Sequence, residues 1–82
     1  MNQLVLRSGQ LCLNRCDDDL WMGLYKSKAE LPTIAGITPI ADSRIAQYDG
    51  HPALRMASFF IPLSEDEARA IGEWMPELKV KS

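Results

Sequence analysis

The chain has 82 residues, of which 46% are hydrophobic and 24% are charged, a balance typical of one folded domain and unlike that of a disordered chain. No apolar run approaches the roughly 20 residues that a membrane-spanning helix needs. The net charge of −2 comes from nine basic and eleven acidic residues that are scattered, which argues against a nucleic-acid-binding stripe and against a mimic of DNA. We therefore expect a single domain over residues 1–82.

The amino-terminal sequence has no basic start followed by an apolar stretch and a cleavage site, so we expect no signal peptide and a cytoplasmic location. Cys12 and Cys16 are then expected as free thiols. On one strand they would lie about 13 Å apart, whereas a disulfide needs Cα atoms within about 7 Å.

Residues 3–15 alternate between apolar and polar side chains and predict a hairpin. A two-residue turn at Ser8 and Gly9 would bring Val5 opposite Cys12 on one face of the pair. The same register gathers four leucines on the other face: Leu4, Leu6, Leu11 and Leu13.

The acidic run 17–19 predicts a solvated turn before a third strand over residues 20–26, so that the first three strands form a meander. Residues 27–30 have the spacing of a capping box, but Pro32 leaves room for only about one helical turn. The segment 32–39 is apolar yet contains two prolines and a glycine, and we expect an irregular or edge segment packed on the core.

A second hairpin is predicted by Asp49 and Gly50, the residue pair that a type I′ turn favours. We expect its first strand over residues 44–48 and its return strand, unbroken, over 51–61, with Pro52 near the start. An unbroken strand would be apolar on both faces. One face would carry Leu54, Met56 and Phe60, and the other Ala57, Phe59 and Ile61.

A helix over residues 65–75 is predicted by Ser64 and Glu67, which have capping-box spacing. Pro76 ends it, and the segment 77–80 is expected as a short edge strand or a tail. An apolar stripe of Ala68, Ile71 and Met75, with Trp74 at its margin, would cover one face of the strand 53–61. The other face would need the segment 32–41 or a second chain.

These elements predict an α+β fold, with an antiparallel sheet of about five strands packed against one C-terminal helix. The N-terminal meander and the C-terminal hairpin would together form the sheet.

Catalytic chemistry is not indicated by the titratable residues. His51 is the only histidine and has no partners at metal-ligand or catalytic spacing. The acidic run 17–19 could bind a divalent cation, but a solvated turn is favoured because no phosphate-binding motif accompanies it. Cys12 and Cys16 lack the CxxC spacing of redox or zinc sites. We therefore expect no enzyme, no metal and no cofactor.

Apolar and aromatic surface beyond what one helix can cover favours a protein-binding or regulatory module, with a homodimer as an open alternative to a larger partner protein. The candidate partner-binding residues are Trp21, Tyr25, Tyr48, His51 and Phe59. Small domains of this kind are common among phage and mobile-element products, including inhibitors of host defence proteins, and this association extends the hypothesis to an inhibitor. The alternative is a protein that sequesters a small ligand or nucleotide in a pocket between subunits. An enzyme using Asp17, Asp19 or His51 is the least favoured reading.

Overall fold

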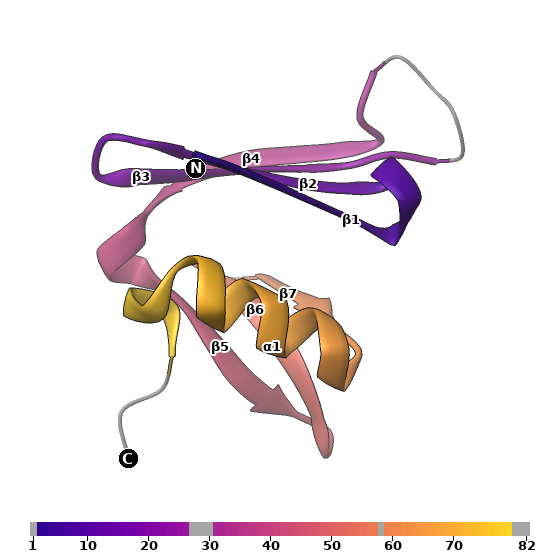
Figure 1. The fold of residues 1–82 in the computed structure, drawn as a ribbon, viewed down its shortest axis with the longest axis vertical. Helices are drawn as coiled ribbons and strands as arrows, with labels where there is room; N and C mark the ends of the chain where they lie inside the picture. The colour runs from indigo at the N-terminus through magenta and orange to yellow at the C-terminus, as the bar shows by residue number, and fades with distance from the viewer. Residues whose placement is uncertain (1, 27–30, 58, 80–82) are drawn as a thin grey trace. The chain divides into compact units, whose positions relative to one another are not determined.

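The computed structural model describes residues 2–26, 31–57 and 59–79. The chain divides into two compact units, Met1–Pro39 and Ile40–Ser82. Within these residues, the two units contain seven strands in two antiparallel sheets and one α-helix near the C-terminus (Figure 1). The expected α+β class is confirmed, although the strands form two sheets rather than one of about five.

The first unit is a four-stranded antiparallel sheet whose strands lie in chain order. Its strands are β1 (Gln3–Leu6), β2 (Leu11–Cys16), β3 (Asp19–Leu24) and β4 (Ile34–Pro39). The predicted register of the first hairpin is confirmed, since Leu6 lies opposite Leu11 and Val5 opposite Cys12. Ser8 and Gly9 have φ of 54° and 95°, as a type I′ turn requires.

The segment 32–39 was expected to be irregular or to lie at an edge. The edge alternative is confirmed, because β4 is a regular edge strand. It pairs with β3 along its whole length and forms one edge of the sheet. The ladder tolerates the prolines because Pro32 precedes the strand and Pro39 is its last residue. The helical turn expected over 27–30 lies outside the described residues.

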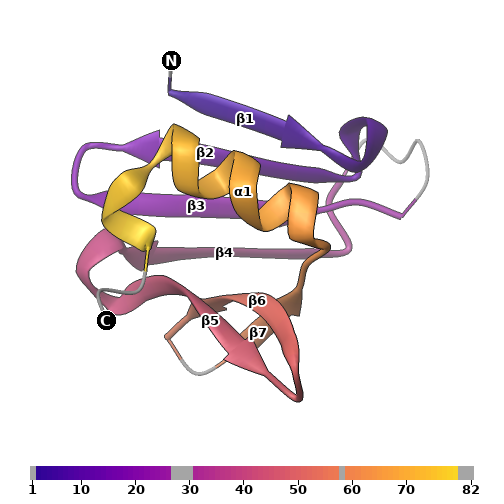
Figure 2. The ribbon, with the colours of Figure 1, turned by 60° about the horizontal axis from the view of Figure 1, so that its bottom comes forward.

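The second unit combines a three-stranded sheet with a helix (Figure 2). Its elements are β5 (Ser43–Tyr48), β6 (His51–Met56), β7 (Phe59–Pro62) and α1 (Glu65–Trp74), with 3₁₀ helices at Ile40–Asp42 and Pro76–Leu78. Asp49 and Gly50 have φ of 53° and 78°, so the predicted turn between β5 and β6 is confirmed.

The predicted unbroken strand 51–61 is wrong, because the chain reverses between β6 and β7. Ala57 has φ of 54°, and Met56 lies directly opposite Phe59. Opposed residues share a face, so Phe59 joins Met56, whereas Phe60 lies on the opposite face beside Arg55. The reversal therefore exchanges the expected faces of the two phenylalanines.

The predicted capping box of α1 is confirmed. The Glu67 N–H donates to Ser64 Oγ at 3.1 Å, and the Ser64 N–H donates to Glu67 Oε1 at 2.8 Å. Ile71 and Met75 are buried, as their stripe predicts. The segment after α1 is a 3₁₀ turn with a buried Leu78 rather than a strand, so this leucine joins the core.

The core of the second unit lies on the face of its sheet that carries Leu54, Met56 and Ile61. We call this the inner face and the opposite one the outer face. The sequence predicted a strand with two apolar faces that would both need a cover. In the structure, most of the large apolar side chains of β6 and β7 lie on the inner face instead.

Candidate functional site

The outer face of the three-stranded sheet carries a stacked pair of aromatic rings. The rings of Tyr48 on β5 and Phe60 on β7 have centroids 4.7 Å apart and planes inclined by 24°. The register places Ala53 of β6 on the same face, and this alanine is only 1% exposed. Because the methyl side chain of Ala53 is short, rings from the two flanking strands can meet above the central strand.

Arg55 extends this ring pair. It lies directly opposite Phe60 in the ladder, and its guanidinium carbon is 5.7 Å from the Phe60 ring centroid, within cation–π range. Its Nε donates to the Ala57 carbonyl oxygen at 3.3 Å, which holds the guanidinium near the turn between β6 and β7. We call Tyr48, Arg55 and Phe60 the aromatic–arginine surface.

The rings of this surface remain accessible to solvent. Tyr48 is 54% exposed and Phe60 is 37% exposed, so a partner can reach both aromatic rings. A ring held in place by stacking and by an arginine loses little side-chain freedom when a partner binds.

The five predicted partner-binding residues are divided between the two units. Tyr48 and His51 lie opposite each other at the end of the β5–β6 hairpin, and both are exposed. Phe59 lies on the inner face of that sheet, at 37% exposure. Trp21 and Tyr25 belong to the first unit.

Trp21 and Tyr25 are half-buried and flank Gly23 on β3. A Cβ added to Gly23 would lie 2.5 Å from the Trp21 Cη2 and 3.1 Å from the Tyr25 Cε1. Both rings therefore lean over the glycine and cover the strand backbone, which explains why Gly23 is buried. The two rings therefore have a packing role in the first unit.

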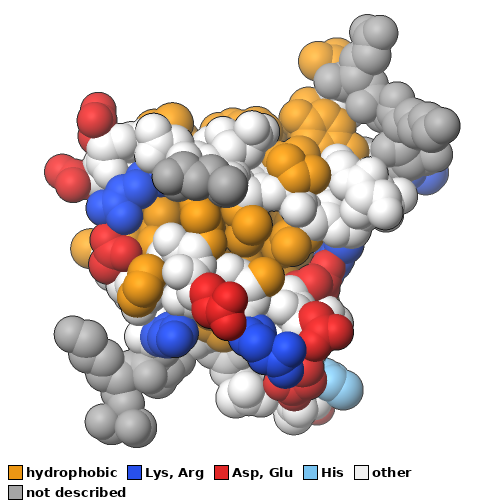
Figure 3. Space-filling view, viewed as in Figure 1, with side chains coloured by type: hydrophobic (Ala, Val, Ile, Leu, Met, Phe, Trp, Pro, Cys, Tyr) orange, Lys and Arg blue, Asp and Glu red, His pale blue; other side chains and the backbone are white. Residues whose placement is uncertain are grey.

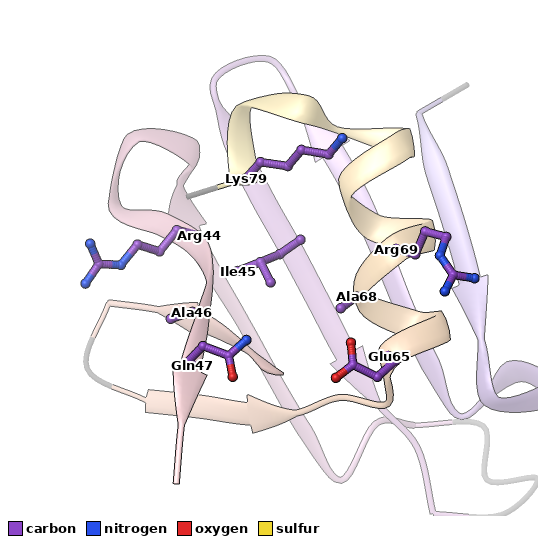
Figure 4. Close-up of a pocket in the computed structure, with 8 residues that line it drawn as sticks. All are labelled: Arg44, Ile45, Ala46, Gln47, Glu65, Ala68, Arg69 and Lys79. Atoms are coloured by element: carbon purple, nitrogen blue, oxygen red, sulfur yellow. The ribbon is translucent and has the colours of Figure 1, made fainter. Parts of the chain in front are cut away.

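A cleft of about 730 Å³ lies between β5 and α1 in the second unit. The residues that line it are Arg44, Ile45, Ala46, Gln47, Glu65, Ala68, Arg69 and Lys79 (Figure 4). None of the five predicted partner-binding residues lines this cleft.

Basic and acidic side chains are interspersed on the face seen in Figure 3. Within the described residues, no group of three or more histidine, cysteine, aspartate or glutamate side chains could hold a metal ion. Asp17 lies in the turn between β2 and β3 with φ of 55°, and Cys12 and Cys16 are free thiols.

Phe60 and Arg55 were missed by sequence reasoning because the turn at Ala57 carries no glycine, asparagine or proline signal. Without that turn, alternation assigns Phe60 to the core side. The spacing from Asp49 to Ser64 would have offered a clue, since it has room for two short strands and a second tight turn.

Comparisons with family models, with curated proteins and with solved structures gave no match. In the part of the chain that the structure describes, no helix is long and apolar enough to cross a membrane.

Proposed function

We propose that this protein is a non-enzymatic binding module that recognises another protein through the aromatic–arginine surface. The observation that carries the proposal is the exposed Tyr48–Phe60 stack with Arg55 against it. Tyrosine, tryptophan and arginine are the residues that most often dominate the free energy of binding at protein interfaces.

The chemistry of this surface suits a folded partner with an apolar patch rimmed by acidic groups. The rings offer apolar area at low entropic cost, and Arg55 offers planar donors that match carboxylates. Arg44 lies directly opposite Arg55 and adds a second positive charge at the same end of the sheet. A carboxylate on the partner would relieve the repulsion between these two arginines.

In its specific form, the proposal is that the module acts as an inhibitor, a phage or mobile-element product that occupies a surface of a host defence protein. A small domain without catalytic groups of its own can act by blocking access to a larger protein. The support for an inhibitor is the association of such compact domains with mobile elements. An inhibitor would use the same aromatic–arginine surface.

The test is affinity capture from a bacterial lysate with three forms of the chain. A double variant, Tyr48→Ser with Phe60→Ser, removes the stack, while Ile37→Ser removes an apolar side chain that is 60% exposed on the first unit. Circular dichroism first establishes that all three forms are folded. We expect one partner captured by the unaltered chain and by Ile37→Ser, and lost with the double variant.

If the double variant still captures the partner, the aromatic–arginine surface is not the binding site. If the unaltered chain captures no partner, the protein is not the binding module that we propose. The inhibitor form has its own readout, which is the activity of the captured partner measured with and without the chain. An unchanged activity would leave a binding module that does not inhibit.

A further inference from the structure

The β5–α1 cleft is bounded on one side by the free edge of strand β5. β5 is bonded to β6 on one side, and in the described chain it has no strand on the other. The cleft runs along this open side, between β5 and α1 (Figure 4). An open strand edge beside a helix is the geometry in which extended peptides add to a sheet.

The register determines which backbone groups of β5 point into the cleft. In a hairpin closed by a two-residue turn, the flanking residues Tyr48 and His51 form a hydrogen-bonded pair, and such pairs alternate along the ladder. Ile45 and Gln47 then occupy the alternate positions, where N–H and C=O groups point away from β6. These groups are available to a further strand.

Pro52 supports this assignment independently. It lies opposite Gln47 and has no N–H to donate, and its carbonyl oxygen accepts from the Leu63 N–H at 2.9 Å, toward β7. Position 52 therefore makes no backbone bond to Gln47, as a non-hydrogen-bonded pair requires.

The cleft has opposite charges at its two ends. Lys79 after the 3₁₀ turn supplies positive charge at one end, while Glu65 lies near Gln47 at the other end (Figure 4). The side chain of Arg44 points away from α1, on the outer face that also carries Arg55. Ile45 and Ala68 supply apolar surface between the ends.

Two neighbouring contacts define the basic end more closely. Arg69 is engaged by Asp66, with Nη1 and Oδ1 3.1 Å apart, so its charge is already partnered. The stem of Lys79 lies over Gly72, since a Cβ added there would be 2.8 Å from Lys79 Cε. Lys79 is therefore the cation that faces a ligand.

We propose that the β5–α1 cleft binds an extended peptide segment that adds as a fourth strand to the free edge of β5. The segment carries an acidic side chain at the Lys79 end, a small apolar side chain over Ile45 and Ala68, and a basic side chain beside Glu65. Side chains on one face of a strand recur every second residue, so these three occupy alternate positions.

A second copy of this chain matches the cleft less well than such a peptide. β5 has the sequence SRIAQY, which contains no acidic residue, so in a second copy only the flanking Asp42 and Asp49 could bring a carboxylate to the basic end. The proposal is also separate from the aromatic–arginine surface, because none of Tyr48, Arg55 and Phe60 lines the cleft.

The probe is a capped heptapeptide of threonines with glutamate, valine and lysine at its second, fourth and sixth positions. Its binding to the full chain is followed by amide chemical shifts in NMR titrations. One control peptide exchanges the glutamate and the lysine, and another has N-methyl groups on alternate amides, which prevents strand addition.

The matched variants are Gln47→Pro and Gln47→Val. Both remove the side-chain amide, but only proline removes the outward N–H, and it does so without breaking a bond to β6. We expect Gln47→Pro and the N-methylated peptide each to weaken binding by at least about ten-fold, while Gln47→Val stays within about three-fold of the unaltered chain. Ile37→Ser, at an exposed position of the first unit, should leave peptide binding unchanged.

Equal binding by Gln47→Pro and Gln47→Val would overturn strand addition, and equal binding of the charge-exchanged peptide would overturn the charge assignment. Light scattering on the chain alone tests the competing occupant. A dimer that Gln47→Pro converts to a monomer, together with no peptide binding, would replace the peptide by a second copy.

Discussion

The stacking of Tyr48 on Phe60 can be measured as a coupling energy. Phe59 and Phe60 are adjacent and equally exposed, at 37%, yet they lie on opposite faces of the sheet. The pair therefore provides a matched comparison, in which Phe60→Ala breaks the stack and Phe59→Ala does not.

The expected cost of each single substitution follows from the covered area. About two thirds of a phenylalanine surface of roughly 200 Å² is shielded, which at about 25 cal/mol per Å² corresponds to about 3 kcal/mol. Compactness of the unfolded chain lowers this to about 2 kcal/mol. A fully buried phenylalanine would cost about 3–5 kcal/mol, so the expected value also tests the partial exposure of Phe60.

The decisive quantity is the coupling in a double-mutant cycle with Tyr48→Ala, measured by urea unfolding followed by circular dichroism. Tyr48 and Phe60 should be coupled by about 0.5–1.5 kcal/mol, the range for aromatic pairs. Tyr48 and Phe59 should be additive within about 0.5 kcal/mol. Additivity of Tyr48 with Phe60, or coupling with Phe59 instead, would refute the reversal at Ala57 and with it the aromatic–arginine surface.

Substitutions at three further positions test the local structure by the same unfolding measurement. Ser64→Ala should lower the free energy of unfolding by about 1 kcal/mol through loss of the cap, and Ser64→Asp, which keeps an acceptor, should lower it less; equal losses would contradict the cap. Gly50→Ala should cost about 1–2 kcal/mol because φ is 78°, and Gly50→Asn should cost less, so equal costs would argue against a type I′ turn. Gly72→Ala should stabilise α1 by up to about 1 kcal/mol while displacing the flexible end of Lys79, so a large destabilisation would mean that Lys79 cannot move.

Much of the local structure was determined by the sequence, because the signals lie within a few residues of one another. The Ser8–Gly9 and Asp49–Gly50 turns need positive φ, and their neighbouring alternation leaves one register that gathers the apolar side chains. The cap at Ser64 is equally local, since both of its hydrogen bonds join residues three apart. These features were predicted correctly for that reason.

Candidate sites depended on information that no short stretch contains. The reversal at Ala57 uses an alanine at positive φ, a conformation that the surrounding sheet imposes and that alanine itself disfavours. One such reversal moved Phe60 to the outer face and brought it onto Tyr48, twelve residues away in the chain. A face is assigned by counting residues from the nearest turn, so an unrecognised turn inverts every assignment beyond it.

The β5–α1 cleft also depends partly on local sequence signals and partly on tertiary packing. The sequence supplied the strand at β5 and the helix at α1, each from its own periodicity. Only the tertiary structure placed Ile45 of β5, Ala68 of α1 and Lys79 around the same cleft. Local chemistry fixes the elements and their turns, whereas the partners of a strand edge or an exposed ring are decided by packing between residues far apart in the chain.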